Sequence, residues 1–259
     1  MKSDWLLPDW PAPAGVQALC TTRSGGTSAP PFDAMNLGAH VGDRAQAVAA
    51  NRALLQQAIQ ARPLFLSQVH GTAAAYLAGA QAPKTDADAS LTDQPGLACT
   101  VMVADCLPVL LTNRRGSAVA AAHAGWRGLA GRHGRGVLES VLASLELLSD
   151  PDPGQRGSEL MAWLGPCIGP RAFEVGDDVR EVFVTRDPEA KSMFSPLGGA
   201  KWLADLPGLA RRRLRALGVT QIYGNDGGDD WCTVGNPARY FSHRRDRVSG
   251  RMAACIWIG

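Results

Sequence analysis

Apolar residues in this chain gather in short runs that glycine, proline and aspartate interrupt. Three such runs, 98–104, 108–112 and 117–122, follow one another in the middle of the sequence. Short apolar runs between turn-forming residues are typical of buried β-strands. We predict further strands in VQALCTT, LFLSQVH, LMAWL and VTQIYG, and an apolar C-terminal segment that completes a central sheet.

Other segments place apolar residues at helical spacing, which predicts helices at 44–61, 132–148 and 202–217. Asp43 is the expected N-cap of the first helix. The third helix carries an arginine cluster mostly opposite its apolar face, and we predict that this cluster is solvated. A further helix begins in FEVGDDV, where acidic residues in the first turn favour the helix dipole.

The elements follow one another without a division of the chain into parts. Residues 1–15 are predicted to lie extended over the surface, with Trp5 and Trp10 packing inward. The Pro/Gly-rich segment 150–157 is interpreted as a connection, and there is no internal repeat or low-complexity tract. We therefore predict one α/β domain of the α+β type spanning 1–259, with mixed sheets flanked by helices.

Composition narrows the classes of function. The chain has 259 residues, 46% of them hydrophobic, and a net charge of +2, so no concentrated basic face predicts nucleic-acid binding. The N-terminus lacks the apolar core of a secretion signal, and no stretch is long enough to span a membrane. Six cysteines without an export signal favour reduced thiols, and we predict a cytoplasmic protein that does not bind membranes.

The candidate chemistry lies where the predicted strands end. His70, Cys106 and His123 each close an apolar run, so their side chains can converge on one point. One thiolate and two imidazoles suit zinc, and three protein ligands leave the open position of a catalytic site. Asp105, beside a ligand, can accept a proton or orient the site. A buried thiol with two structurally bonded histidines is the alternative.

Several polar residues near these strands are candidates for substrate contact. Arg127 stands in the HAGWRG cluster before a predicted helix, where free backbone N–H groups favour an anion. Arg23 precedes a glycine-rich turn that can do the same. We hypothesise phosphate between them, with solvated arginines as the alternative. Asp86 and Asp88 are equally compatible with support of the site and with solvation.

The histidine count argues against one class of metalloenzyme. A multicopper oxidase needs many histidines for a mononuclear site and a trinuclear cluster, usually in HxH pairs. This chain has five histidines and no HxH motif. Copper can still bind the thiol and imidazoles adventitiously, because copper binds such ligands tightly. A physiological phenol oxidase is therefore not predicted from the residues.

Many short motifs in this chain occur in the order typical of one family. They are TTRSGG, NLG, SQVHG, DADA, ADC, HAGWRG, GPCIGP, FEVG and YFSHRRD followed by SGRMAACI. Together they resemble the YfiH/YlmD family, relatives of human FAMIN, over about residues 21–258. Members of that family have been called polyphenol oxidase or laccase, purine nucleoside phosphorylase and peptidoglycan editing factor.

The resemblance implies a layered α-β-β-α, YfiH-like architecture with the site at one edge of the sheets. It implies zinc bound by His70, Cys106 and His123, which would also be catalytic together with Asp105. It further implies substrate or phosphate contacts from four residues: Arg23, Asn36, Arg127 and Arg244. Arg171 departs from the family pattern, because a cysteine commonly stands at that position. Any mechanism that needs a thiol there is weakened.

Three functions follow as expectations from the resemblance. The first is zinc-dependent phosphorolysis of purine nucleosides (adenosine, inosine, guanosine or methylthioadenosine), with adenosine deamination as a second activity. The second is an amidase or hydrolase that edits peptidoglycan precursors, which would not need phosphate. The third is a metal-binding protein without turnover. Sequence alone leaves open the purine preference, the metal loaded in the cell, whether Cys106 reacts, and the oligomeric state.

Overall fold

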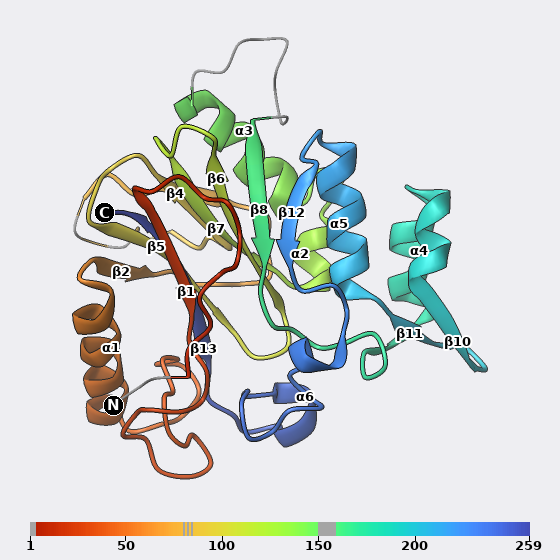
Figure 1. Cartoon of the computed structure of the whole chain (residues 1–259). Coiled ribbons are helices and arrows are strands. Elements are labelled where there is room, and N and C mark those ends of the chain that lie inside the picture. The colour runs from red at the N-terminus through yellow and green to blue at the C-terminus, as the bar shows by residue number, and fades with distance from the viewer. Residues whose placement is uncertain (1–3, 80, 82, 84, 150–158) are drawn as a thin grey trace.

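Two β-sheets pack face to face, and helices cover their outer faces (Figure 1). The computed structural model describes residues 4–79, 81, 83, 85–149 and 159–259. The predicted connection at 150–157 lies outside these residues. Within them, no helix is long and apolar enough to cross a membrane.

The smaller of the two sheets places the C-terminal strand in its interior. Its strands, in spatial order, are β1 (Val16–Cys20), β13 (Met252–Ile258), β5 (Leu97–Val103) and β2 (Arg62–Phe65). β13 pairs antiparallel with both neighbours, whereas β2 runs parallel to β5. The prediction that the apolar C-terminal segment completes a central sheet is confirmed.

The larger sheet contains the other two of the three central apolar runs. Its strands, in spatial order, are β12 (Gln221–Gly224), β8 (Leu160–Leu164), β6 (Leu107–Asn113), β7 (Val119–Ala124), β4 (Ala89–Thr92) and β3 (Ala74–Tyr76). The inner pairs are antiparallel and the two outer pairs are parallel. Both sheets are therefore mixed, as predicted.

Alternation along the strands explains why the sheets form the middle layers. On β6, Leu110 packs between the sheets, while Val109 and Leu111 on the opposite face pack toward helices. On β5, Val101 joins the same inter-sheet core. Because both faces of these strands are buried, the sequence there is continuously apolar rather than alternating.

Helices form the two outer layers. They contain α1 (Ala45–Ile59), α2 (Trp126–Ala130), α3 (Val137–Ser149), α4 (Asp177–Val184) and α5 (Leu206–Ala216), whereas the single turn of α6 (His243–Asp246) lies beside the pocket described below. Leu55 and Ile59 of α1 pack on the smaller sheet, and Leu209 and Leu214 of α5 join the core on the outer face of the larger one. The α-β-β-α prediction is confirmed.

Several predicted boundaries were wrong. Asp43 is not the N-cap of α1: Arg44 occupies that position without a side-chain cap, and the Asp43 carboxylate accepts from Ser28 and Asn36. The helix predicted at 132–148 begins at Val137. The helix predicted at 202–217 begins at Leu206, because the residues before it form a strand.

That strand belongs to a small third sheet that was not predicted from the sequence. β9 (Glu174–Gly176), β10 (Phe194–Gly198) and β11 (Lys201–Ala204) form it, and the β10–β11 hairpin projects beside α4 (Figure 1). The N-terminal segment behaves as predicted: Trp5 and Trp10 are partly buried against the two sides of the smaller sheet.

The arginines of α5 do not form the predicted solvated face. Arg211 donates to four backbone carbonyls at the end of β12, and Arg213 donates to Leu129 and Ala130 and pairs with Glu139. Of the four arginines in the cluster, Arg215 alone is exposed. Backbone carbonyls at element ends need donors, and long arginine side chains supply them.

Candidate metal centre

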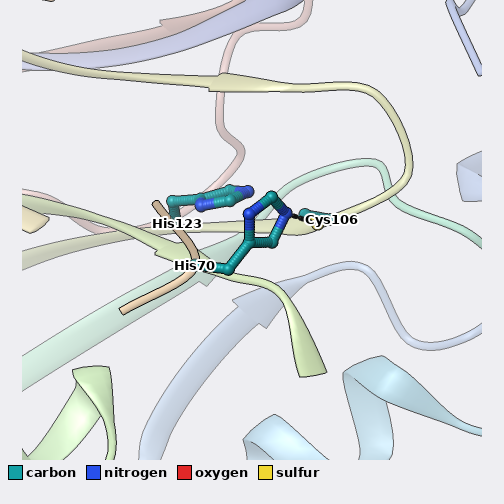
Figure 2. Close-up of side chains that lie close together, drawn as sticks. All are labelled: His70, Cys106 and His123. Atoms are coloured by element: carbon teal, nitrogen blue, oxygen red, sulfur yellow. Dashed lines mark hydrogen bonds between the residues drawn. The ribbon is translucent and has the colours of Figure 1, made fainter. Parts of the chain in front are cut away.

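His70, Cys106 and His123 converge at one end of the two main sheets (Figure 2). Their ligand atoms all lie within 4.8 Å of one another, and Cys106 Sγ is 3.7 Å from His70 Nε2. The His70 and His123 rings meet edge-on at a centroid distance of 4.8 Å. The sequence-predicted convergence of these residues is therefore present in the fold.

The three candidate ligands lie in different structural elements: a turn, a strand and a loop. Cys106 occupies the turn between β5 and β6, and His123 lies on β7 near its end. His70 was expected at a strand end, but β2 ends at Phe65 and His70 stands in the following loop with φ of 59°. Asp105 has φ of 89°. Such backbone is costly for residues with side chains and is found where the surrounding structure fixes it.

Asp88 supplies the hydrogen bonds that fix the His70 loop. Its carboxylate is buried and accepts from the backbone N–H groups of Val69, His70 and Gly71 at 3.1, 2.9 and 2.6 Å. Asp86, two residues earlier, is exposed and accepts from the Ser67 hydroxyl. The two aspartates of the DADA motif therefore differ in burial and in their contacts. The sequence did not indicate which of them supports the site.

The same carboxylate also orients the second histidine. Asp88 Oδ1 lies 2.8 Å from Nδ1 of His123, which leaves Nε2 of that ring for a metal ion. Burial works against the charged form of Asp88, but hydrogen bonds from His123 and the loop amides hold the pKa of this carboxyl below its ordinary value. A carboxylate behind a ligating imidazole is a common arrangement at metal sites.

The electrostatics favour a thiolate at Cys106. Burial would raise its pKa, yet the nearby His123 and His70 lower the pKa of Cys106 to about 6. Burial disfavours charge on His123 as well, but the Cys106 thiolate and Asp88 raise the pKa of this imidazole. By contrast, burial raises the pKa of Cys99 and of Cys255 to about 12. Only a thiolate ligates a metal ion well.

Glycines of the HAGWRG segment give the ligands room. A Cβ on Gly125 would lie 2.8 Å from Cys106 Sγ and 3.1 Å from His70 Cδ2. A Cβ on Gly128 would lie 2.7 Å from the carbonyl oxygen of Gly71. Because only glycine fits at these contacts, this segment can pack directly against two ligands.

The ligands open into a pocket of about 350 Å³, a size typical of small-molecule sites. Its apolar lining comprises Met102, Ala104, Trp126, Ile168, Phe173 and Leu206. Its cationic lining comprises Arg127, Arg244, Arg247 and Arg251, and the imidazoles of His40 and His243 also line it. Among the described residues that line the pocket, Asp105 is the one carboxylate, so the pocket favours a ligand with negative charge.

Asp105 is engaged with the protein on both oxygens. Oδ1 accepts from the Thr233 hydroxyl and Oδ2 from the backbone N–H of Arg244, each at 2.6 Å. These bonds attach Thr233 and the first turn of α6 to the turn that carries Cys106. Of the two roles considered for Asp105, this geometry supports orientation of the site.

The structure brings two of the four predicted substrate residues to the pocket. Arg127 stacks on Trp126 with its guanidinium carbon 4.6 Å from the ring centroid. Arg244 lies over Phe173 at 5.5 Å and donates to the carbonyl of Glu174.

Arg23 and Asn36 do not belong to the described pocket lining. The Arg23 guanidinium pairs with Asp33 and donates to the carbonyl of Pro237. Asn36 is fully buried and bonds to the protein itself. The hypothesis of phosphate between Arg23 and Arg127 is therefore not supported by their positions.

Sequence reasoning missed part of the pocket lining. His40 was not among the predicted site residues, yet it lines the pocket while remaining exposed. Arg247 and Arg251 were not identified. The SGRM motif was the available signal for Arg251. Cys167 is fully buried, and its Sγ accepts from Asn225 Nδ2, so it has a structural role.

The donor set fits a single metal ion. A thiolate with two imidazoles at these separations can surround one ion and leave a position open to the pocket. Within the described residues, no other group of three such side chains comes together. The fold and this site together define a layered α-β-β-α protein with one candidate metal centre in a cationic small-molecule pocket.

Comparison with known proteins identifies the family. A family model described as multi-copper polyphenol oxidoreductase laccase matches residues 17–259. A purine nucleoside phosphorylase of Pseudomonas aeruginosa is 50% identical over 255 residues, 98% of each chain. Purine nucleoside phosphorylase YfiH of Escherichia coli is 47% identical over 258 residues, 99% of each.

Solved structures agree with this relationship. A Neisseria meningitidis protein superposes with a TM-score of 0.87 at 46% identity, covering 98% of this chain and 99% of its own. YlmD from Geobacillus stearothermophilus gives a TM-score of 0.88 at 31% identity, covering 100% and 97%. The chain belongs to the YfiH family, and the resemblance seen in the sequence motifs is confirmed.

Proposed function

We propose that this protein is a zinc-dependent purine nucleoside phosphorylase. The observation that carries the proposal is the placement of His70, Cys106 and His123 in a pocket that has both an apolar and a cationic lining. Relatives at 50% and 47% identity over nearly the whole chain are named purine nucleoside phosphorylase. The cationic lining, the apolar lining and the names of these relatives therefore all favour a purine nucleoside and phosphate as substrates.

Zinc is the metal that the donor set favours. It is borderline-soft and accepts mixed sulfur and nitrogen ligands, whereas magnesium and calcium prefer oxygen. When bound, the ion would supply Lewis acidity at the floor of the pocket. Asp88 holds two ligands in place through the His70 backbone and the His123 ring.

The chain's own residues account for substrate binding. In phosphorolysis an oxygen of phosphate forms a bond to C1′ as the bond from C1′ to the purine nitrogen breaks. The electron pair of the broken bond stays on that nitrogen, which takes up a proton, so the products are the free base and the pentose 1-phosphate. The negative charge of the phosphate group lies near the guanidinium groups of the cationic lining. The apolar lining, with Trp126 and Phe173, suits the flat purine. Adenosine, inosine, guanosine and methylthioadenosine are the proposed substrates.

Adenosine deamination is proposed as a second activity of the same pocket. It needs attack of water at C6 of the purine, and the ring would have to lie with that edge toward the metal ligands. Phosphate is not consumed in this reaction. The two activities are therefore separable by their products, inosine in one case and adenine in the other.

A hydrolase acting on acyl groups, such as peptidoglycan precursors, is the second candidate. One observation favours it: Cys106, His123 and Asp88 stand in the order of a nucleophile, a base and an orienting acid, and the pKa of Cys106 is lowered to about 6. The absence of a phosphate requirement would distinguish it. A laccase is disfavoured, since five histidines cannot supply four copper sites.

A product assay on metal-analysed protein tests the proposal. Adenosine and inosine are incubated with and without inorganic phosphate, using wild type and Cys106→Ala. We expect adenine or hypoxanthine together with ribose 1-phosphate, and the loss of both without phosphate or in the variant. If neither nucleoside changes while zinc is fully occupied, the purine proposal is wrong, and acylated cell-wall precursors become the next substrates to assay.

A further inference from the structure

The buried NLG motif contacts Arg251, which lines the pocket, and does not itself reach the pocket. Asn36 Oδ1 accepts from the backbone N–H of Arg251 at 2.9 Å and from that of Gly38 at the same distance. Asn36 Nδ2 donates to Asp43, and the Asn36 side chain is completely buried. The amide therefore anchors the start of β13 to the loop 36–38.

Gly38 leaves the space through which the Arg251 side chain passes. A Cβ at position 38 would lie 2.8 Å from Cγ and 3.2 Å from Cβ of Arg251. The residue has no positive φ, so the space, and not the backbone conformation, explains the glycine. Asn36 and Gly38 thus position one particular side chain that lines the pocket.

The Arg251 guanidinium is only partly used by the protein. Nη1 donates to the carbonyls of Ser249 and Gly250. In the described part of the chain, Nε and Nη2 have no hydrogen-bond acceptor, and no carboxylate forms an ion pair with this residue. The free donors of this half-buried guanidinium need acceptors from within the pocket, which water or a ligand can supply.

Other groups around Arg251 increase the positive charge. Arg247 and Arg244 line the same pocket, and neither forms an ion pair among the described residues. His40 adds no charge of its own, because burial, and after it Arg251 and Arg52, lower the pKa of this imidazole. Asp105 and Cys106 act on Arg251 electrostatically, but among the described residues no ion pair joins Asp105 to Arg251. The two oxygens of Asp105 accept from Thr233 and the Arg244 amide.

We propose that Arg251 binds inorganic phosphate in this pocket through Nε and Nη2, and that Asn36 and Gly38 position it. The proposal deepens the proposed function and rests on it for the identity of the anion. The planar fork of a guanidinium matches two phosphate oxygens. In this assignment Asn36, which was predicted to contact the substrate, instead positions Arg251, and Arg251 contacts the phosphate.

Calorimetric titration of inorganic phosphate tests the proposal without any nucleoside. Wild type, Arg251→Gln, Arg251→Lys, Gly38→Ala and Arg62→Gln are compared in phosphate-free buffer at one ionic strength, after each variant is shown to be folded by circular dichroism. Arg62 is exposed on β2 outside the pocket lining and serves as the matched control. A parallel titration uses adenosine 5′-monophosphate, to distinguish free phosphate from a phosphate carried by a nucleotide.

We expect Arg251→Gln to weaken phosphate binding about 10- to 100-fold, since two charge-assisted hydrogen bonds are lost. Arg251→Lys should recover part of the loss, and Gly38→Ala should also weaken phosphate binding. In the product assay, Gly38→Ala should raise KM for phosphate with little change in KM for the nucleoside. Arg62→Gln should bind as wild type does. The Gly38 variant separates positioning from a merely structural role.

Unchanged phosphate affinity in folded Arg251→Gln would overturn the proposal, and so would binding of the nucleotide but not of free phosphate. These results are distinguishable from failure of the proposed function. Phosphorolysis with an unaltered KM for phosphate in Arg251→Gln would leave the function and remove Arg251. Arg251-dependent phosphate binding without turnover of any nucleoside would leave Arg251 and remove the function.

Discussion

A single buried carboxylate, Asp88, fixes the position of two of the three candidate metal ligands at once. It accepts from the backbone N–H of His70 and contacts Nδ1 of His123. The two amides flanking His70 donate to the same group. Removing its charge therefore affects the loop, the ring orientation and the basicity of the ligand together.

Asp88→Asn should lower metal affinity about 10- to 100-fold, the usual cost of losing such a partner. The amide group has one acceptor fewer and places an N–H₂ among N–H donors. Competition titration with a chromogenic zinc chelator measures the change. Asp86→Asn is the matched control, because Asp86 is exposed and contacts Ser67 instead. Equal affinities in the two variants would contradict this account of Asp88.

Cys106 should react as a thiolate in the metal-free protein. Because its pKa is lowered to about 6 and the thiolate is the reactive form, alkylation should rise with pH through this value and level off above it. An ordinary thiol, with a pKa near 8.5, would still be rising there. Mass spectrometry after iodoacetamide treatment gives the rate at Cys106, and zinc should suppress it. A profile that keeps rising beyond about pH 8 would show that the imidazoles do not activate this thiol.

At the scale of elements, close packing of the HAGWRG segment against the ligands is the central feature. Gly125→Ala places a methyl group against Cys106 Sγ and His70, which must shift. We expect a loss of about 1–3 kcal/mol in unfolding free energy, as for other overpacked sites, and weaker metal binding. Denaturant unfolding compares it with Gly15→Ala, where a Cβ meets nothing within 4 Å. If both variants are equally stable, the segment is more compliant than its contacts indicate.

Arg211 connects α5 to the end of β12. Its guanidinium donates to the carbonyls of Ile222, Tyr223, Gly224 and Asn225. Arg211→Met should lower stability by roughly 1–3 kcal/mol, because partly buried carbonyls lose their donor. Arg215→Met, on the exposed face of the same helix, should change stability by less than about 0.5 kcal/mol. Urea midpoints for the two variants decide between this reading and a solvated arginine cluster.

For the whole molecule, the candidate metal centre brings together segments that belong to different sheets. His70 follows β2 of the smaller sheet, and His123 belongs to β7 of the larger one. Cys106 stands in the turn between β5 and β6, where the chain passes from one sheet to the other. An ion bound to all three would therefore tie the two layers together.

Zinc should stabilise the native protein by mass action. At a free concentration of about 100 times Kd, the gain is about 2.7 kcal/mol, which corresponds to a Tm increase of roughly 5–10 °C for a chain of this size. Scanning calorimetry of metal-free protein with added zinc measures it. Cys106→Ala should show a much smaller shift at the same concentration. A comparable shift in the variant would place the stabilising ion elsewhere.

The sequence by itself determined the strand-rich core, the α-β-β-α class and the three candidate ligands. Apolar runs and helical spacing are local signals, and Cys106 and His123 lie beside such runs. The family motifs, being many and in order, were equally readable along the chain. These features need no knowledge of which segments meet in space.

Only the tertiary structure decided which of the other polar residues support or line the pocket. Asp86 and Asp88 are alike in sequence, and one is buried because the His70 loop folds over it. Arg23 bonds to nearby loops, whereas Arg251 reaches the pocket because a loop far away in sequence holds it. A long charged side chain takes the nearest acceptor that packing offers, and packing is set by residues distant along the chain.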